Sequence, residues 1–137
     1  MHLRRTISSL SVMALGVSGA LFTATPARAE EGYDRCPAGY YCMFSGLDGT
    51  GDMIKLTRST PDLAVFGMND LAKSDWNRTS SKIHLWSDAR YTGCTAVTDS
   101  GPTGKGNFFP AYRDFFSSVG FGGPAGPPCG GPVDSSE

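Results

Sequence analysis

The sequence contains little of what an enzyme active site requires. Only two of its 137 residues are histidine, and His2 belongs to the extreme N-terminus, so a Ser-His-Asp triad would have to use His84. No serine lies in a Gly-x-Ser-x-Gly motif, and the carboxylates are spread along turn-like, solvated segments. We therefore predict no catalytic residues and no enzyme activity. His84 is predicted to be a strand residue with its ring partly packed and one nitrogen in solvent.

Long apolar runs are also absent after residue 22. The chain starts with a basic segment containing Arg4 and Arg5, continues with an apolar run over residues 10–22, and then reaches Ala27-Arg28-Ala29. These are the three parts of a secretory signal peptide, and the apolar run falls short of the roughly 20 residues that span a membrane. We predict that residues 1–29 are a bacterial signal peptide, cleaved after Ala29, and that the protein is secreted.

An excess of basic charge is missing as well. Residues 30–137 contain nine basic and thirteen acidic residues, a balance of −4. This argues against a nucleic acid or an anionic membrane as partner. The length is that of one domain, which we expect to be a monomer with a modest core that needs covalent support.

The paired Cys-x2-Cys units of a typical zinc site do not occur. An even number of cysteines in a secreted chain favours disulfides, with three pairings possible: Cys36, Cys42, Cys94 and Cys129. A proline and a glycine between Cys36 and Cys42 allow the chain to fold back, so we pair these two locally and Cys94 with Cys129. Zinc ligation by the cysteines is the alternative.

No long stretch has a helical period. Residues 52–57 and 82–86 alternate polar and apolar side chains, as strands with one buried face do. Residues 61–66 could form a single turn at most. We predict an all-β domain over residues 30–121. Residues 122–137 are rich in Gly and Pro, and we predict a flexible tail there, tethered at Cys129.

Two segments are repeated in the sequence. Met43–Gly51 and Leu85–Gly93 align without gaps at an offset of 42, and each has an apolar residue, an aromatic residue, a serine and a closing glycine. Asn69–Ser74 and Arg113–Ser118 follow them at an offset of 44. An aromatic residue followed by a polar, Gly-rich run is typical of a folded hairpin. The chain therefore duplicates a whole supersecondary unit.

This combination resembles the double Greek key sandwich of βγ-crystallin-like domains. Together with Cys36-Pro37-Ala38-Gly39-Tyr40-Tyr41-Cys42, Asn69-Asp70 and Trp76–Ser81, it is similar to peptidase inhibitor family I36, the Streptomyces metalloproteinase-inhibitor group. The resemblance covers about residues 36–121. It implies a disulfide-stapled inhibitor whose partner is an extracellular zinc metalloprotease. Killer-toxin-like antimicrobial proteins and calcium-binding structural modules of the same fold are the alternatives.

The resemblance also implies an inhibitory loop in the second key beside a cysteine, which corresponds to Cys94, Thr95, Ala96 and Val97. A rigid, substrate-like loop loses little entropy on binding, and its carbonyl can approach the catalytic zinc. The chain departs from the family pattern in two ways. Thr95 is polar where a thermolysin-like pocket prefers a larger apolar side chain, and Cys94 has no cysteine partner a few residues on. An ordinary strand edge is the alternative for this segment.

In calcium-binding crystallin-like domains the two Asn/Asp-rich runs supply oxygen ligands. Both runs are altered here, since Lys73 places an ammonium where a ligand is expected and Arg113 replaces the leading Asn or Asp. We predict weak calcium binding at most, and no cofactor. The alternative is that Ser74, Ser81 and Ser118 hydrogen-bond the folded hairpins. The degenerate calcium ligands would be Asn69, Asp70, Ser74, Asp114 and Ser117.

Overall fold

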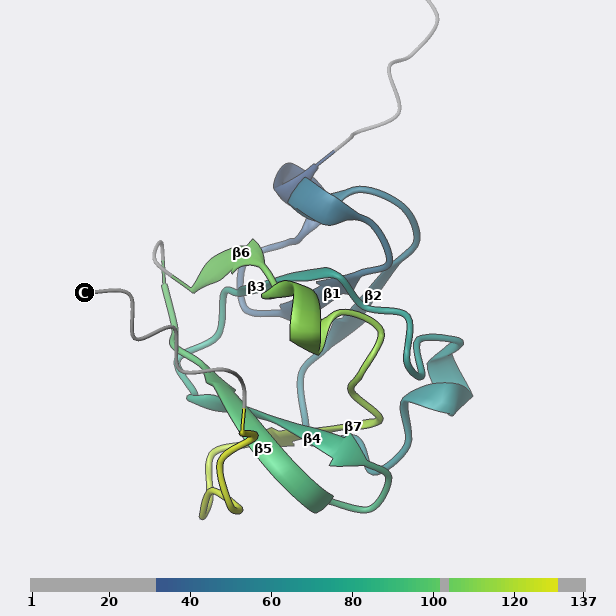
Figure 1. Cartoon of the computed structure of the whole chain (residues 1–137). Helices are drawn as coiled ribbons and strands as arrows, with labels where there is room; N and C mark the ends of the chain where they lie inside the picture. Colours follow the sequence, from purple (N-terminus) through teal and green to yellow (C-terminus); the bar gives the residue numbers. More distant parts are fainter. Residues whose placement is uncertain (1–31, 102–103, 131–137) are drawn as a thin grey trace, which may run out of the picture.

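The computed structural model describes residues 32–101 and 104–130, which form a sandwich of two antiparallel β-sheets (Figure 1). The strand order is β2-β1-β3-β6 in the first sheet and β5-β4-β7 in the second. The predicted signal peptide lies outside the described residues. The strands are β1 (Tyr41–Phe44), β2 (Met53–Leu56), β3 (Ser74–Asn77), β4 (Ile83–Asp88), β5 (Thr92–Thr98), β6 (Lys105–Asn107) and β7 (Ser118–Phe121).

The remaining described elements are short 3₁₀ turns: η1 (Tyr33–Arg35), η2 (Leu47–Gly49), η3 (Leu63–Phe66) and η4 (Pro110–Tyr112). The predicted all-β fold is confirmed, and η3 occupies the segment for which at most one turn was expected. No helix within residues 32–101 and 104–130 has the length and apolar character to cross a membrane.

The two halves of the chain exchange strands between the sheets. β6 follows β5 along the chain but pairs with β3 in the first sheet. In the opposite direction, Thr60 pairs with Val119 at the edge of the second sheet, through Thr60 N–H to the Val119 carbonyl (2.8 Å) and the reverse bond (3.0 Å). Each sheet therefore contains a segment from the other half, which is the crossover of a double Greek key.

A serine holds each repeated hairpin closed. The Ser74 hydroxyl donates to the Gly46 carbonyl (2.7 Å) and accepts from the Gly49 N–H (3.0 Å). Forty-four residues later, the Ser118 hydroxyl donates to the Asp88 carbonyl (2.7 Å) and accepts from the Tyr91 N–H (3.1 Å). Ser74 and Ser118 thus hydrogen-bond the hairpins, as the alternative to calcium ligation expected, whereas the Ser81 hydroxyl makes no hydrogen bond within the described residues.

The core lies between the sheets. Inward-facing strand residues and residues of the connecting segments form one fully buried cluster. It is closed at one side by the rings of Phe108, Tyr112, Phe115 and Phe116, which pack edge-to-face or tilted. The cluster contains Tyr41, Met43, Leu56, Leu63, Met68, Ala72, Ile83, Leu85, Phe116 and Val119.

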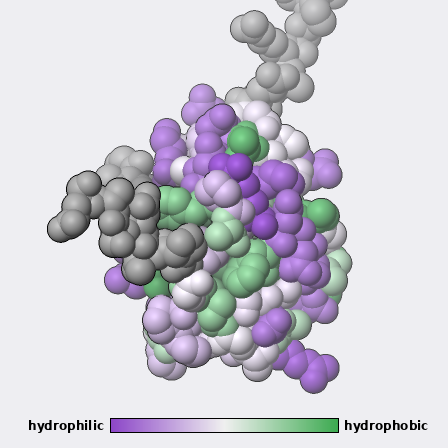
Figure 2. All heavy atoms as spheres, viewed as in Figure 1, coloured by the Kyte–Doolittle hydropathy of each residue, from purple (hydrophilic) through white to green (hydrophobic). Residues whose placement is uncertain are grey.

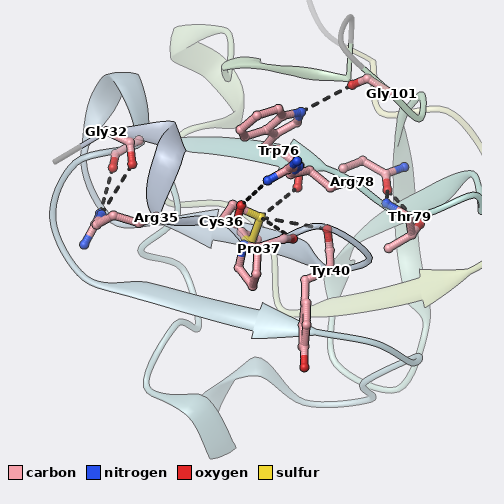
Figure 3. Close-up of a disulfide and its surroundings, with 12 residues drawn as sticks. Gly32, Arg35, Cys36, Pro37, Tyr40, Trp76, Arg78, Thr79 and Gly101 are labelled. Carbon is pink, nitrogen blue, oxygen red and sulfur yellow. Dashed lines mark hydrogen bonds between the residues drawn. A yellow bond between two sulfur atoms is a disulfide. The ribbon is translucent and has the colours of Figure 1, made fainter. Parts of the chain in front are cut away.

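A second, smaller cluster lies on the outer side of the first sheet, around the disulfide Cys36–Cys42 (Figure 3). This bridge confirms the predicted local pairing, and it fixes the segment before β1 onto the sheet. The Arg78 guanidinium donates to the Cys36 carbonyl (2.7 Å) and lies over the Trp76 ring. The N-terminal segment is therefore tied to β3 by polar contacts as well as by the covalent bond.

Candidate functional site

The predicted inhibitory segment, Cys94–Val97, lies inside strand β5. Trp86 of β4 is opposite Thr95, and Leu85 is opposite Ala96. The segment is thus a strand at the border of the second sheet, and it does not protrude as a loop. Its local geometry comes from the alternation of residues 92–98, in which Ala96 packs against the core while Val97 is 48% exposed.

The outer edge of β5 is covered at Thr95 by the C-terminal segment. Thr95 N–H donates to the Pro127 carbonyl (2.7 Å), and the Thr95 carbonyl accepts from Cys129 N–H (3.0 Å). The Thr95 hydroxyl donates to the Gly126 carbonyl (2.9 Å). Only 5% of Thr95 is exposed, so its side chain and its carbonyl are both engaged within the protein.

Gly126 allows this close approach. A Cβ atom at this position would lie 2.3 Å from the Trp86 ring, far inside contact distance. Residues 122–130 belong to the segment predicted to be a flexible tail, and the structure shows Gly126, Pro127 and Cys129 of this segment bonded to Thr95 of β5. The rest of that predicted tail, residues 131–137, lies outside the described residues.

A disulfide joins Cys94 to Cys129, as predicted, with Cα atoms 4.7 Å apart. The Cys129 carbonyl accepts a hydrogen bond from the Tyr112 hydroxyl (3.0 Å). The inhibitory segment is therefore held on three sides: by β4, by the C-terminal segment, and by a covalent bridge that closes a loop of 35 residues.

The two Asn/Asp-rich runs lie next to each other. They are joined by direct contacts between their own side chains, an ion pair and a hydrogen bond. The Lys73 ammonium lies 2.7 Å from the Asp114 carboxylate. Asp70 accepts from the Ser117 hydroxyl (3.2 Å) through one oxygen and from the Asn69 amide (2.9 Å) through the other. The oxygens that would face a cation already have donors.

Ser74, the remaining predicted calcium ligand, is fully buried, and its hydroxyl bonds to the Gly46 carbonyl and the Gly49 N–H of the first hairpin. Within residues 32–101 and 104–130 no cluster of three or more His, Cys, Asp or Glu side chains is placed to hold a metal ion. The residues of the runs do not fit a calcium ion, because the Lys73 ammonium already pairs with the Asp114 carboxylate and both Asp70 oxygens accept from other side chains.

Asp75 was not singled out from the sequence, and it is the most unusual titratable group of the domain. It is buried in β3, where Oδ2 accepts from the Tyr41 hydroxyl (2.9 Å) and from the Thr98 hydroxyl (2.8 Å). Burial raises the pKa of Asp75 from 3.8 to about 7, against the two hydrogen bonds, which lower it. Burial also raises the pKa of Tyr41, helped by the Asp75 charge. Alternation in β3 would have placed Trp76 inward and Asp75 outward, whereas Trp76 packs in the outer cluster and Asp75 is buried, so no local signal indicates this acid.

His84 also differs from its predicted role as a partly solvated strand residue. It is 5% exposed, and its Nδ1 atom has no hydrogen-bond partner in the described part of the chain. Among the described residues, no hydrogen bond joins the His84 side chain to Asp75 or to the Cys94–Val97 segment. His84 is thus a packed strand residue.

A family model for peptidase inhibitor family I36 matches residues 29–98, about half of the chain. The match includes Cys94–Val97 and ends before Cys129. No curated protein sequence gives a significant match.

Solved structures with the same fold are βγ-crystallin domains. A structure described under the evolution of the eye lens βγ-crystallin domain fold is 22% identical over 64% of this chain and 89% of its own, with a TM-score of 0.57. A βγ-crystallin from Ciona intestinalis is 24% identical over 61% and 100%, with a TM-score of 0.54. A domain from Clostridium beijerinckii is 14% identical over 60% and 95%, with a TM-score of 0.51. At these identities the likeness concerns the fold alone.

Proposed function

Because the chain belongs to peptidase inhibitor family I36, and is therefore a protein inhibitor of proteases and not an enzyme, we propose that its target is an extracellular zinc metalloprotease. The contact surface in this proposal is the β5 segment Cys94–Val97 with the C-terminal residues bonded to it. We also propose that the secreted chain begins at Glu30, after the leader. Both disulfides are compatible with an oxidising compartment.

The observation that supports this proposal is that neighbouring segments hold Cys94–Val97 in one conformation. Binding costs entropy whenever a flexible segment must be ordered, and a segment already held in one conformation avoids that cost. Cys94–Val97 has β4 on one side, and the C-terminal residues are bonded at Thr95 on the other. The protease would then meet a rigid strand with Val97 exposed beside it.

The Thr95 carbonyl imposes a condition on how the segment can face the catalytic zinc. It accepts from Cys129 N–H, and only 5% of Thr95 is exposed, so a zinc ion can reach this carbonyl only if the C-terminal residues that cover it move aside. The Cys94–Cys129 bridge would keep the C-terminal segment beside β5 when this happens. Residues 126–129 are therefore part of the proposed contact surface, although the family match ends before them.

The test is an inhibition panel of thermolysin-like, serine and cysteine proteases with micromolar inhibitor. We expect inhibition of the zinc enzyme only. Val97→Glu should raise the inhibition constant at least tenfold, because it places a charge in the contact. Val65→Glu is the matched control, since Val65 is also exposed (79%) but lies on η3. A folded sample that leaves every metalloprotease active, or equal effects of the two substitutions, would overturn the proposal.

A further inference from the structure

A groove of about 550 Å³ opens between the two sheets where β5 and β6 form their borders. Its floor includes Leu85 and Phe116 of the core, and Phe108 and Phe109 contribute to its walls. Phe109 is 75% exposed. On the face drawn in Figure 2, apolar side chains gather over η4 and the segment that follows it. Its lining includes Ala96 and Val97 of the β5 segment but not Thr95.

Beside this groove, the edge of β5 has no strand paired to it among the residues that the structure describes. Backbone groups of alternate strand residues point the same way, so Val97 N–H and C=O point away from β4, as those of Thr95 do. The C-terminal segment does not continue the pairing, because the Cys129 carbonyl accepts from the Tyr112 hydroxyl instead. Within residues 32–101 and 104–130, Val97 has no backbone partner on this side.

Such an edge can accept an extended peptide as an additional strand. Side chains of an added strand alternate between its two faces. Those on the inner face would enter the groove between the sheets and meet Leu85, Phe108 and Phe116. The backbone would supply hydrogen bonds at Val97, and the groove would select the side chains.

The charges at the groove favour a cationic side chain. Asp75 lies at its floor, and both of its hydrogen bonds end on Oδ2, which leaves Oδ1 without a partner among the described residues. Asp99 lies at the rim, where its side chain is 74% exposed and its carboxylate lies 3.7 Å from the Lys82 ammonium, so Asp75 is the acid that a bound cation would meet. Lys105 also contributes to the lining, but its ammonium lies over the Trp76 and Tyr33 rings on the outer side of the first sheet.

We propose that this groove binds an extended segment of another protein that carries a Lys or Arg side chain, adding it as a strand to β5 at Val97. The apolar stem of that side chain would lie along the aromatic walls, and its head would reach Asp75. This site shares Val97 with the proposed protease contact but binds its ligand through the groove and Asp75. The peptide titration below contains no protease, so either proposal can fail without the other.

The experiment uses the full secreted chain and two capped heptapeptides, one alternating Val with Lys and one alternating Val with Glu. Amide chemical shifts are followed at pH 8, where Asp75 is largely ionised. We expect the Lys peptide to shift the Val97 amide and the Glu peptide not to. Asp75→Asn should weaken binding about tenfold or more, since a charge-assisted hydrogen bond is lost. Asp52→Asn, an exposed acid outside the groove, is the matched control.

Two further variants keep the proposal testable if one of them folds poorly. Val97→Pro removes the N–H that points away from β4, and an edge strand tolerates proline at such a position. Phe109→Ser removes an exposed aromatic ring from the wall of the groove. Each variant should abolish or strongly weaken binding. Equal binding of the two peptides, or binding of neither, would overturn the proposal. It would also be overturned if only a chain ending at Gly130 bound the Lys peptide, because the chain's own C-terminus would then be the occupant.

Discussion

At the scale of single residues, Asp75 is the side chain expected to have the largest effect on the stability of the domain. Its carboxylate joins Tyr41 of β1 to Thr98 of β5, and so links the two sheets through buried hydrogen bonds. Buried polar groups of this kind are tolerated because their hydrogen bonds are made. The cost is electrostatic, since an ionised carboxylate loses its hydration in the interior.

The stability of the domain should therefore depend on pH through Asp75. Its pKa is about 7 in the folded protein and near the ordinary 3.8 in the unfolded chain. Between these values the folded state keeps a proton that the unfolded state has lost, so the free energy of unfolding falls as pH rises from about 4 to about 7. A difference of about three pKa units corresponds to a loss on the order of 2–4 kcal/mol.

Asp75→Asn keeps an oxygen that accepts from Tyr41 and Thr98 and cannot ionise. We expect it to remove most of this pH dependence and to be more stable than the wild type at pH 8. Urea unfolding at pH 5 and pH 8 measures the effect. Asp52→Asn serves as the control for a substitution at an exposed position, and an unchanged pH profile in Asp75→Asn would contradict the assignment.

Lys73 is the single residue expected to control the calcium affinity of the domain. Its ammonium pairs with Asp114 and competes directly with a cation for that carboxylate. We expect calorimetry to find no micromolar calcium affinity in the wild type, and tighter binding in Lys73→Ser, which frees Asp114. Lys82→Ser removes the other ion-paired lysine, at Asp99, and should have no effect. Micromolar binding by the wild type would refute this prediction.

At the scale of elements, the repeated unit is a hairpin closed by one serine. Each hydroxyl makes one bond as donor and one as acceptor to backbone groups of its hairpin. These bonds satisfy backbone groups that the folded hairpin cannot pair with itself. Ser74 and Ser118 lie at equivalent positions of the two halves, so they should matter to a similar degree.

We expect Ser74→Ala and Ser118→Ala each to lower the free energy of unfolding by about 1–3 kcal/mol, because each leaves backbone groups without a partner. Ser81→Ala is the control, since the Ser81 hydroxyl makes no hydrogen bond in the described part of the chain, and it should cost within about 0.5 kcal/mol. Denaturant midpoints give the values. Equal costs for all three variants would show that the serines do not staple the hairpins.

At the scale of the whole molecule, the two disulfides stabilise different parts. Cys36–Cys42 closes a local loop beside β1, whereas Cys94–Cys129 joins β5 to a segment 35 residues later. Loop entropy assigns roughly 2.4 kcal/mol to the first and roughly 3.8 kcal/mol to the second. The second also keeps the C-terminal segment on the Thr95 edge.

Removing Cys94 and Cys129 together, as serines, should therefore lower the melting temperature more than the same change at Cys36 and Cys42. Hydrogen exchange at the Thr95 amide should become faster in the first double variant only, since its partner is the Pro127 carbonyl. Protease inhibition should weaken in parallel. Unchanged exchange at Thr95 would mean that the hydrogen bonds of residues 126–129 hold without the bridge.

The sequence by itself determined the features that depend on neighbouring residues. The alternation of residues 52–57 and 82–86 predicted strands. The repeated segments, Met43–Gly51 and Leu85–Gly93, predicted a pair of hairpins. Both predictions rest on patterns of neighbouring residues. The family resemblance added the Greek key sandwich. Cysteine spacing and number were enough for the local Cys36–Cys42 pairing, which left Cys94–Cys129 as the remaining pair.

The tertiary structure alone decided the surroundings of the candidate site. Thr95 is buried because Gly126 lets the C-terminal segment pack on Trp86, and a Gly/Pro-rich composition cannot indicate this, since the bonds come from the backbone. Asp75 meets Thr98 only because β3 and β5 of different sheets approach each other. Lys73 likewise finds Asp114 from 41 residues away. Such contacts depend on the pairing of distant segments, which no local pattern encodes.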